Sequence, residues 1–131
     1  MRNSRTLYRI VMSAVCLNAF GPVATTPAES AQKTKSAAQY IIGNTVHGTE
    51  DDGEFFDYYA PDGSATSKLV ANNDITHGRW TIENDNLCLD YPNDTKTCYS
   101  VQGVPPAMTL TEVGAGKVFV IQLLRGNPQK L

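Results

Sequence analysis

From residue 41 onward, short apolar runs alternate with polar turns. The runs are rich in Val, Ile, Tyr, Phe and Thr, and Gly, Asn, Asp and Pro separate them at spacings of about 8 to 12 residues, which is typical of antiparallel strands. The predicted strands are 41–48, 54–60, 64–71, 78–83, 87–91, 97–101, 107–113 and 117–124. Because every connection is short, we expect an all-β fold, a small antiparallel up-and-down barrel of about eight strands.

Strict alternation identifies part of the core. Trp80 and Ile82 fall on one face of their strand, and Met108 and Leu110 do so on theirs, so we expect these four side chains to be core residues. The last strand, VFVIQLL, is apolar on both faces. We therefore expect one short N-terminal helix, within the segment 31–40 and the residues just after it, to cover its outer face.

Consecutive aromatic side chains must face both sides of a sheet. Phe55, Phe56, Tyr58 and Tyr59 form such a group on the second predicted strand. One interpretation is that barrel core and helix cover both sides, and the other is that one pair lines a pocket mouth or a partner surface. These four aromatic residues are candidate binding residues, and the two histidines of the chain are added to them: Phe55, Phe56, Tyr58, Tyr59, His47 and His77.

The beginning of the chain has the pattern of an export signal. Residues 1–9 carry three Arg and no acid, and an apolar stretch follows that is too short for the roughly 20 residues of a membrane span. We expect a cleaved signal peptide at 1–30, a linker or helix at 31–40, a barrel domain at 41–126 and a C-terminal tail at 127–131. The expected location is periplasmic or secreted, with no membrane span after processing.

Cys88 and Cys98 flank a turn-like segment, YPNDTK. A hairpin would place them opposite each other, at a separation that suits a disulfide, and an oxidising compartment would join them. A redox-active pair is the alternative, but such pairs normally have Cys-x-x-Cys spacing at a helix start. The predicted role is structural.

Composition and charge limit the partners. The 131 residues are 41% apolar, which suits one soluble domain. The formal charge is −2, and removing residues 1–30 takes away three Arg and one Glu, which leaves 8 basic and 12 acidic residues and a charge near −4. A mildly acidic chain has no positive field for nucleic acid, so no nucleic-acid partner is expected.

The sequence shows no clear set of residues for metal binding or for catalysis. His47, His77 and the acids of 50–54 lack the spacing of zinc or calcium ligands, and we expect no metal and no cofactor. No nucleophile elbow, metalloprotease helix or phosphate loop is present. The least favoured hypothesis is an enzyme in which His47 or His77 acts as a general base, paired with Asp57 or Asp74.

Several short patterns occur in order between residues 41 and 128: Gly43-Asn44-Thr45, Tyr59-Ala60-Pro61-Asp62-Gly63, Gly78-Arg79-Trp80, Leu87-Cys88, Cys98 and Arg125-Gly126-Asn127-Pro128. Together they resemble a family of small bacterial exported proteins with a domain of unknown function, in which a signal peptide precedes a disulfide-containing β-domain. Arg79 stands where that family usually has Thr. The resemblance implies a location and an architecture and brings no catalytic residues. The plan is also similar to a reduced lipocalin-like fold, an analogy that transfers no ligand.

The function that these features favour is an exported, non-catalytic binding or interaction module. Its expected partner is another envelope protein or a small apolar ligand, and the large predicted core residues favour a filled barrel and hence a protein. An inhibitor of envelope hydrolases, such as a protease or a lysozyme, is the alternative, with 31–40 or the loop 49–53 as the segment that would enter a cleft. A His-dependent enzyme is the third hypothesis.

Overall fold

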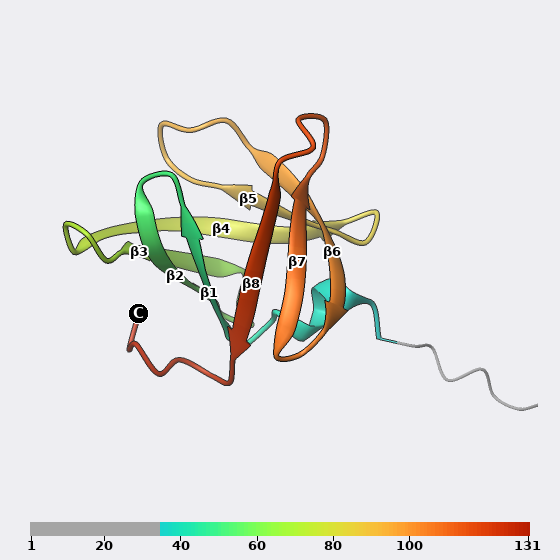
Figure 1. Cartoon of the computed structure of the whole chain (residues 1–131), viewed down its shortest axis with the longest axis horizontal. Coiled ribbons are helices and arrows are strands. Elements are labelled where there is room, and N and C mark those ends of the chain that lie inside the picture. The colour runs from blue at the N-terminus through green and yellow to red at the C-terminus, as the bar shows by residue number, and fades with distance from the viewer. Residues whose placement is uncertain (1–34) are drawn as a thin grey trace, which may run out of the picture. The chain divides into compact units, whose positions relative to one another are not determined.

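The computed structural model describes residues 35–131 as a closed antiparallel barrel (Figure 1). The predicted signal peptide at 1–30 and residues 31–34 of the predicted linker lie outside the described residues. Each strand pairs with the next along the chain, and the last pairs with the first, which confirms the up-and-down topology. The strands are β1 (Thr45–Glu50), β2 (Gly53–Tyr59), β3 (Ser64–Leu69), β4 (Asp74–Glu83), β5 (Asn86–Asp90), β6 (Thr97–Val104), β7 (Ala107–Glu112) and β8 (Val118–Leu124).

Two strand starts differ from the prediction by more than one residue. β1 begins at Thr45 rather than at residue 41, because the chain turns through Gly43, whose φ of +78° suits glycine, and Gly43 N–H donates to the Tyr59 carbonyl. β4 begins at Asp74 rather than at residue 78, because residues 74–77 already pair with β3, from Leu69↔Asp74 to Thr66↔His77, although most of them are polar. Alternation of apolar residues therefore misses a strand end that lies at the rim of the barrel.

The predicted N-terminal helix is a single 3₁₀ turn, η2 (Ala37–Tyr40). It packs against β6, at the end of the barrel opposite the β1–β2 turn, and Ala38 and Ile41 are buried in the core there (Figure 1). The expectation that this segment covers the outer face of the last strand is wrong, since Val118 and Val120 on β8 are 58% and 78% exposed. No helix among residues 35–131 is long and apolar enough to span a membrane.

Side chains fill the end of the barrel next to η2. Met108 and Leu110 are buried, whereas Trp80 and Ile82 are only partly buried and pack against the core. The Trp80 indole N–H donates to the Ala60 carbonyl at 2.8 Å, so its polar edge is satisfied. The most completely buried side chains are Tyr59, Ile41, Leu87, Met108, Val46, Thr45 and Cys88.

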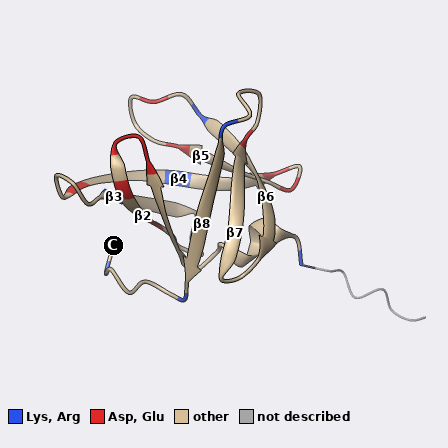
Figure 2. Ribbon diagram, in the orientation of Figure 1, with Lys and Arg blue, Asp and Glu red and all other residues tan. Residues whose placement is uncertain are grey.

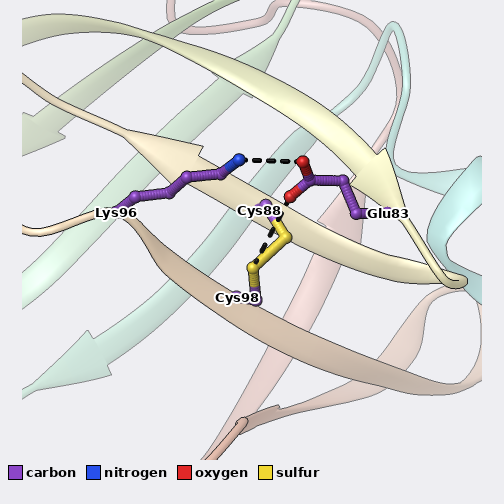
Figure 3. A network of polar contacts seen from close by, with 4 residues as sticks. All are labelled: Glu83, Cys88, Lys96 and Cys98. Atoms are coloured by element: carbon purple, nitrogen blue, oxygen red, sulfur yellow. Dashed lines mark hydrogen bonds and ion pairs between the residues drawn. A yellow bond between two sulfur atoms is a disulfide. The ribbon is translucent and has the colours of Figure 1, made fainter.

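The predicted disulfide between Cys88 and Cys98 is present (Figure 3). The two residues are direct cross-strand partners on β5 and β6. Glu83 lies beside them, with Oε2 3.9 Å from Cys98 Sγ and Oε1 2.8 Å from Lys96 Nζ. A disulfide sulfur carries no proton, so the carboxylate contacts the bond without accepting a hydrogen bond from it.

The C-terminal segment after β8 is tied to the start of β1. Gly126 N–H donates to Asn44 Oδ1 at 2.9 Å, and the Thr45 hydroxyl donates to the Gly126 carbonyl at 2.7 Å. Asn127 then bonds both the backbone N–H and the carbonyl of Leu131 through its side chain. Residues 127–131 therefore form a compact turn.

Candidate functional site

The barrel is filled at one end and hollow at the other. An open cavity of about 480 Å³ lies inside the end that carries the β1–β2 and β5–β6 connections. Its wall includes inward-facing residues of β2, β3, β5 and β6, so strands far apart in the sequence contribute to one site. The expectation of a filled barrel is wrong for this end, because several inward positions there carry short or polar side chains instead of large apolar ones.

Two glycines make room for the aromatic side chains of the wall. Gly48 is the cross-strand partner of Phe55, and a Cβ on Gly48 would lie 2.8 Å from the Phe55 ring. A Cβ on Gly78 would lie 2.5 Å from Cδ1 of Tyr91 and 2.5 Å from the Asp90 carbonyl oxygen. Both rings thus occupy space that any other residue on the neighbouring strand would fill.

Asp57 is the central polar residue of the cavity. It lies on β2 between Phe55 and Tyr59, which share its inward direction, and it is only 9% exposed. The Tyr59 hydroxyl donates to Asp57 Oδ2 at 3.1 Å. Oδ1 is buried and has no hydrogen-bond partner within the described residues, although Ser67 lies directly opposite on β3 and its hydroxyl is close enough to lower the pKa of the carboxyl.

A second buried polar atom without a partner in the described part of the chain is the Tyr91 hydroxyl. It lines the same cavity as Asp57. A buried polar atom that lacks a partner costs about 1 to 3 kcal/mol, so an orphaned acceptor and an orphaned hydroxyl in one cavity are unusual. A bound molecule that offers donors and acceptors there would remove this cost.

Burial controls the protonation of these groups. It raises the pKa of Asp57 to about 6, although the hydroxyls of Ser67 and Tyr59 offset part of the rise. Burial also raises the pKa of Tyr99 to about 12 and that of Tyr91 well above its usual range. At neutral pH the Asp57 carboxylate is therefore largely ionised, and the phenols of Tyr91 and Tyr99 are neutral.

The cavity is lined by acids without a basic side chain among the described residues. Besides Asp57, its wall and mouth include four further carboxyl groups, those of Glu50, Asp52, Asp74 and Asp94. Figure 2 shows the acidic positions gathered on the β1–β2 turn. Burial raises the pKa of Glu50, whereas nearby Lys117 partly offsets the rise. Lys117 itself pairs with Asp51 at 3.0 Å.

The acids of the cavity do not converge into a metal site. Within residues 35–131, the cluster of possible metal ligands whose atoms all lie within 4.8 Å of one another consists of Glu83, Cys88 and Cys98. Both cysteines of that cluster are in the disulfide and offer no thiolate. The carboxylates are spread around the cavity, an arrangement that suits an extended ligand.

The two histidines lie apart from the cavity. His47 Nε2 is 2.7 Å from Glu54 Oε1, and its ring stacks on Phe56 with a centroid distance of 4.4 Å. His77 Nδ1 is 3.2 Å from the Thr66 hydroxyl. β2 and β3 separate the strands that carry them.

The hypothetical pairing of a histidine with Asp57 or Asp74 is not formed. Both acids line the cavity, whereas His47 and His77 occupy strand positions whose side chains point out of the barrel. Their partners in the described residues are Glu54 and Thr66 instead.

The aromatic group on β2 divides between the two faces as alternation requires. Phe55 and Tyr59 are buried and line the cavity, whereas Phe56 and Tyr58 point outward and are half-buried. The inward pair is thus part of the barrel core, as the first interpretation expected for that face, and it also lines the cavity. The outward Phe56 is covered in part by the His47 ring.

The cavity residues that sequence reasoning missed include Asp57 as a cavity acid, Ser67, Tyr91 and Tyr99. One signal was available for Asp57, because Phe55-x-Asp57-x-Tyr59 places an acid between two aromatic residues on the inward face. A signal was also available for Tyr91, because alternation along the predicted strand 87–91 places it on the same face as Leu87 and Leu89, although β5 ends at Asp90.

No family model, curated protein or solved structure matches this chain. The resemblance to exported bacterial proteins and the lipocalin-like plan stay predictions. The chemistry of the site is therefore interpreted from its geometry alone.

Proposed function

We propose that this protein is a non-catalytic binding module whose barrel cavity takes a small molecule. The observation that carries the proposal is Asp57, a nearly buried carboxylate with a partnerless oxygen in the wall of an open cavity of about 480 Å³. Barrels of about eight strands are wide enough to hold one small ligand. Ligand pockets commonly have volumes of about 300 to 1,000 Å³ and combine aromatic walls with few polar groups.

The composition of the wall supports a ligand with both apolar and polar parts. Phe55, Leu89, Leu110 and Phe119 provide apolar surface, and Asp57 provides a fixed polar contact. The purely apolar ligand expected from the sequence would leave that carboxylate unpaired. We therefore replace it with a ligand whose polar group reaches Asp57.

Export from the cytosol remains part of the proposal. The leader pattern of residues 1–30 supports it, and the disulfide between Cys88 and Cys98 is typical of proteins in oxidising compartments. The hydrolase inhibitor and the His-dependent enzyme stay hypotheses. The tight hairpin at Asp51 and Asp52 lends the inhibitor no additional support.

The test uses N-phenyl-1-naphthylamine, a neutral dye whose fluorescence rises in apolar surroundings. We expect saturable binding to the wild-type protein at one site per chain. Leu69→Trp places a large ring at a cavity-lining position and is expected to abolish dye binding.

Val120→Trp is the matched control, because Val120 is exposed on the outer face of β8. It adds the same ring outside the barrel and should leave the dye affinity unchanged. Circular dichroism checks that both variants keep the β-fold. Absence of saturable dye binding, or equal loss in both variants, contradicts the proposal.

A further inference from the structure

We propose that the ligand of the cavity is an organic cation, an amine whose ammonium group is held against Asp57 with aromatic rings around it. This inference rests on the proposed function and specifies its ligand class. Asp57 carries it, because this residue lines the cavity and its buried Oδ1 lacks a hydrogen-bond partner among residues 35–131.

The hydrogen-bonding needs of Asp57 favour a charged donor. Tyr59 satisfies Oδ2 and leaves Oδ1 as an acceptor. An ammonium N–H would donate to Oδ1 and also neutralise the charge, and charge-assisted hydrogen bonds are roughly twice as strong as neutral ones. A ligand carboxylate or phosphate would offer no donor and would place a second negative charge beside the first.

The charge of the whole cavity also favours a cationic ligand. Five carboxyl groups line it, and no basic side chain does so in the described part of the chain. A cleft lined by one sign of charge concentrates ions of the opposite sign. Lys117 lies near the mouth, where it pairs with Asp51 at 3.0 Å and lowers the pKa of Glu50, but it is not among the charged groups that shift the pKa of Asp57.

The aromatic rings of the cavity wall provide a second kind of contact for the ammonium group. Tyr99 and Phe119 pack edge to face in the wall, with ring centroids 6.0 Å apart, and Tyr91 lies in the same wall. Aromatic faces attract ammonium groups, and this attraction grows when the cation is removed from water. The Phe119 ring already attracts one cation, since Lys117 Nζ lies 5.0 Å from its centroid.

An inorganic cation fits the site less well than an amine. The cavity carboxylates do not form a preassembled group of three ligand atoms within residues 35–131. A divalent ion needs several oxygen ligands around one point, whereas an organic cation needs one carboxylate and a surrounding apolar wall. The cavity offers the second arrangement.

The test compares three indole derivatives that share the ring and a CH2CH2 chain at position 3 and differ in the charged or neutral group at its end. Tryptamine is cationic, tryptophol is neutral and indole-3-propionate is anionic. Isothermal titration calorimetry at about pH 8, where Asp57 is ionised, is expected to give an affinity for tryptamine about tenfold or more above that for tryptophol. Indole-3-propionate is expected to bind weakest.

Two charge-neutralising variants assign the selectivity to a residue. Asp57→Asn removes the cavity charge and should reduce the tryptamine affinity to that of tryptophol. Asp85→Asn removes a charge from the exposed β4–β5 turn, outside the cavity lining, and should leave the preference unchanged. Tryptophol binding by Asp57→Asn at the wild-type affinity would show that this variant keeps its cavity.

The outcomes separate this inference from the proposed function. If the neutral dye binds but tryptamine binds no better than tryptophol, the ligand is not a cation and the binding function stands. Equal loss of tryptamine preference in both Asn variants would also overturn the role of Asp57. If neither the dye nor any indole binds, both proposals fail.

Discussion

A hydrogen bond from Tyr59 holds the carboxylate of Asp57 in place. The two residues lie on the inward face of β2, and the Tyr59 hydroxyl donates to Asp57 Oδ2 at 3.1 Å. Tyr59 is fully buried, so its ring cannot move away without disturbing the core. The orientation of the free Oδ1 is therefore set by packing at the filled end of the barrel.

Tyr59→Phe is expected to destabilise the protein by about 1 to 3 kcal/mol, because it leaves the buried carboxylate with one donor fewer. The loss should be larger at about pH 8 than at about pH 4, since an ionised carboxylate accepts a stronger hydrogen bond. Urea unfolding at both pH values measures it. Tyr58→Phe changes the outward neighbour on the same strand and should cost little; equal effects of the two variants would contradict the role of Tyr59.

Asp57 is expected to make the protein less stable at neutral pH than at mildly acidic pH. Its pKa is raised by burial from 3.8 to about 6, so the folded state holds the proton more tightly than the unfolded state. This contribution to stability is complete below pH 3.8 and is lost as the pH rises through about 6, by about 3 kcal/mol in all.

Asp57→Asn tests this linkage, because an amide has the same shape and does not titrate. Urea unfolding across this pH range should show a smaller loss of stability with rising pH than in the wild-type protein. The variant should also be the more stable of the two at neutral pH. Identical pH profiles would mean that Asp57 does not titrate in this range.

The binding of tryptamine is expected to weaken as the pH falls through the pKa of Asp57. At about pH 5 most of the carboxyl is protonated, and the affinity should be about tenfold below that at about pH 8. The other titratable groups around Asp57 are Glu50, Tyr59, Tyr91 and Tyr99. The three tyrosines stay neutral in this range, because burial raises their pKa values.

Calorimetry in buffers of different ionisation enthalpy measures the proton released when tryptamine binds near pH 6. The release should be absent in Asp57→Asn. Glu50→Gln separates the second acid, whose pKa burial also raises. Loss of the pH dependence in Glu50→Gln but not in Asp57→Asn would contradict the proposal, because it would show that Glu50 is the titrating group.

The barrel could be predicted from the sequence because its strands are short and its turns are chemically specific. The pairing of Cys88 with Cys98 followed from the hairpin between them, and the topology followed from the short connections. The start of β4 could not be found in this way. Its first residues, Asp74 among them, lie at the rim, where polar side chains face both water and the cavity.

The cavity could not be predicted, because it depends on how side chains from distant strands share space. The Tyr91 ring lies where a side chain at residue 78 would be, and the sequence does not show that Gly78 and Tyr91 approach each other so closely. The sequence drew attention to the histidines, which are chemically versatile residues. The structure instead places the unsatisfied polar group at Asp57, which looked like an ordinary acid on a strand.

Loss of the disulfide is expected to lower stability without removing the cavity. The bond between Cys88 and Cys98 joins residues separated by 10 positions, and closing a ring of this size stabilises a fold by about 2 to 3 kcal/mol. It lies on the outer face of the barrel, away from Asp57. Cys88→Ser combined with Cys98→Ser should therefore lower the free energy of unfolding by that amount and keep tryptamine binding at temperatures where the variant stays folded.

Gly78→Ala is expected to disturb the cavity more than Gly48→Ala does. At Gly78 the new methyl group would meet the backbone carbonyl of Asp90 and the Tyr91 ring, both at 2.5 Å. At Gly48 it would meet the far end of the Phe55 side chain at 2.8 Å, and that ring can rotate away. Overpacking of this kind costs about 1 to 3 kcal/mol, and we expect the larger value at Gly78, where backbone must shift.

Urea unfolding and tryptamine titration of both glycine variants measure these effects. Because Tyr91 belongs to the proposed cation site, Gly78→Ala should lower the tryptamine affinity as well as the stability. The chemical shifts of the Tyr91 ring should change in Gly78→Ala and stay close to the wild-type values in Gly48→Ala. A Gly78→Ala protein of wild-type stability, with an unshifted Tyr91 ring, would show that the space opposite Gly78 is not what holds this ring in the cavity wall.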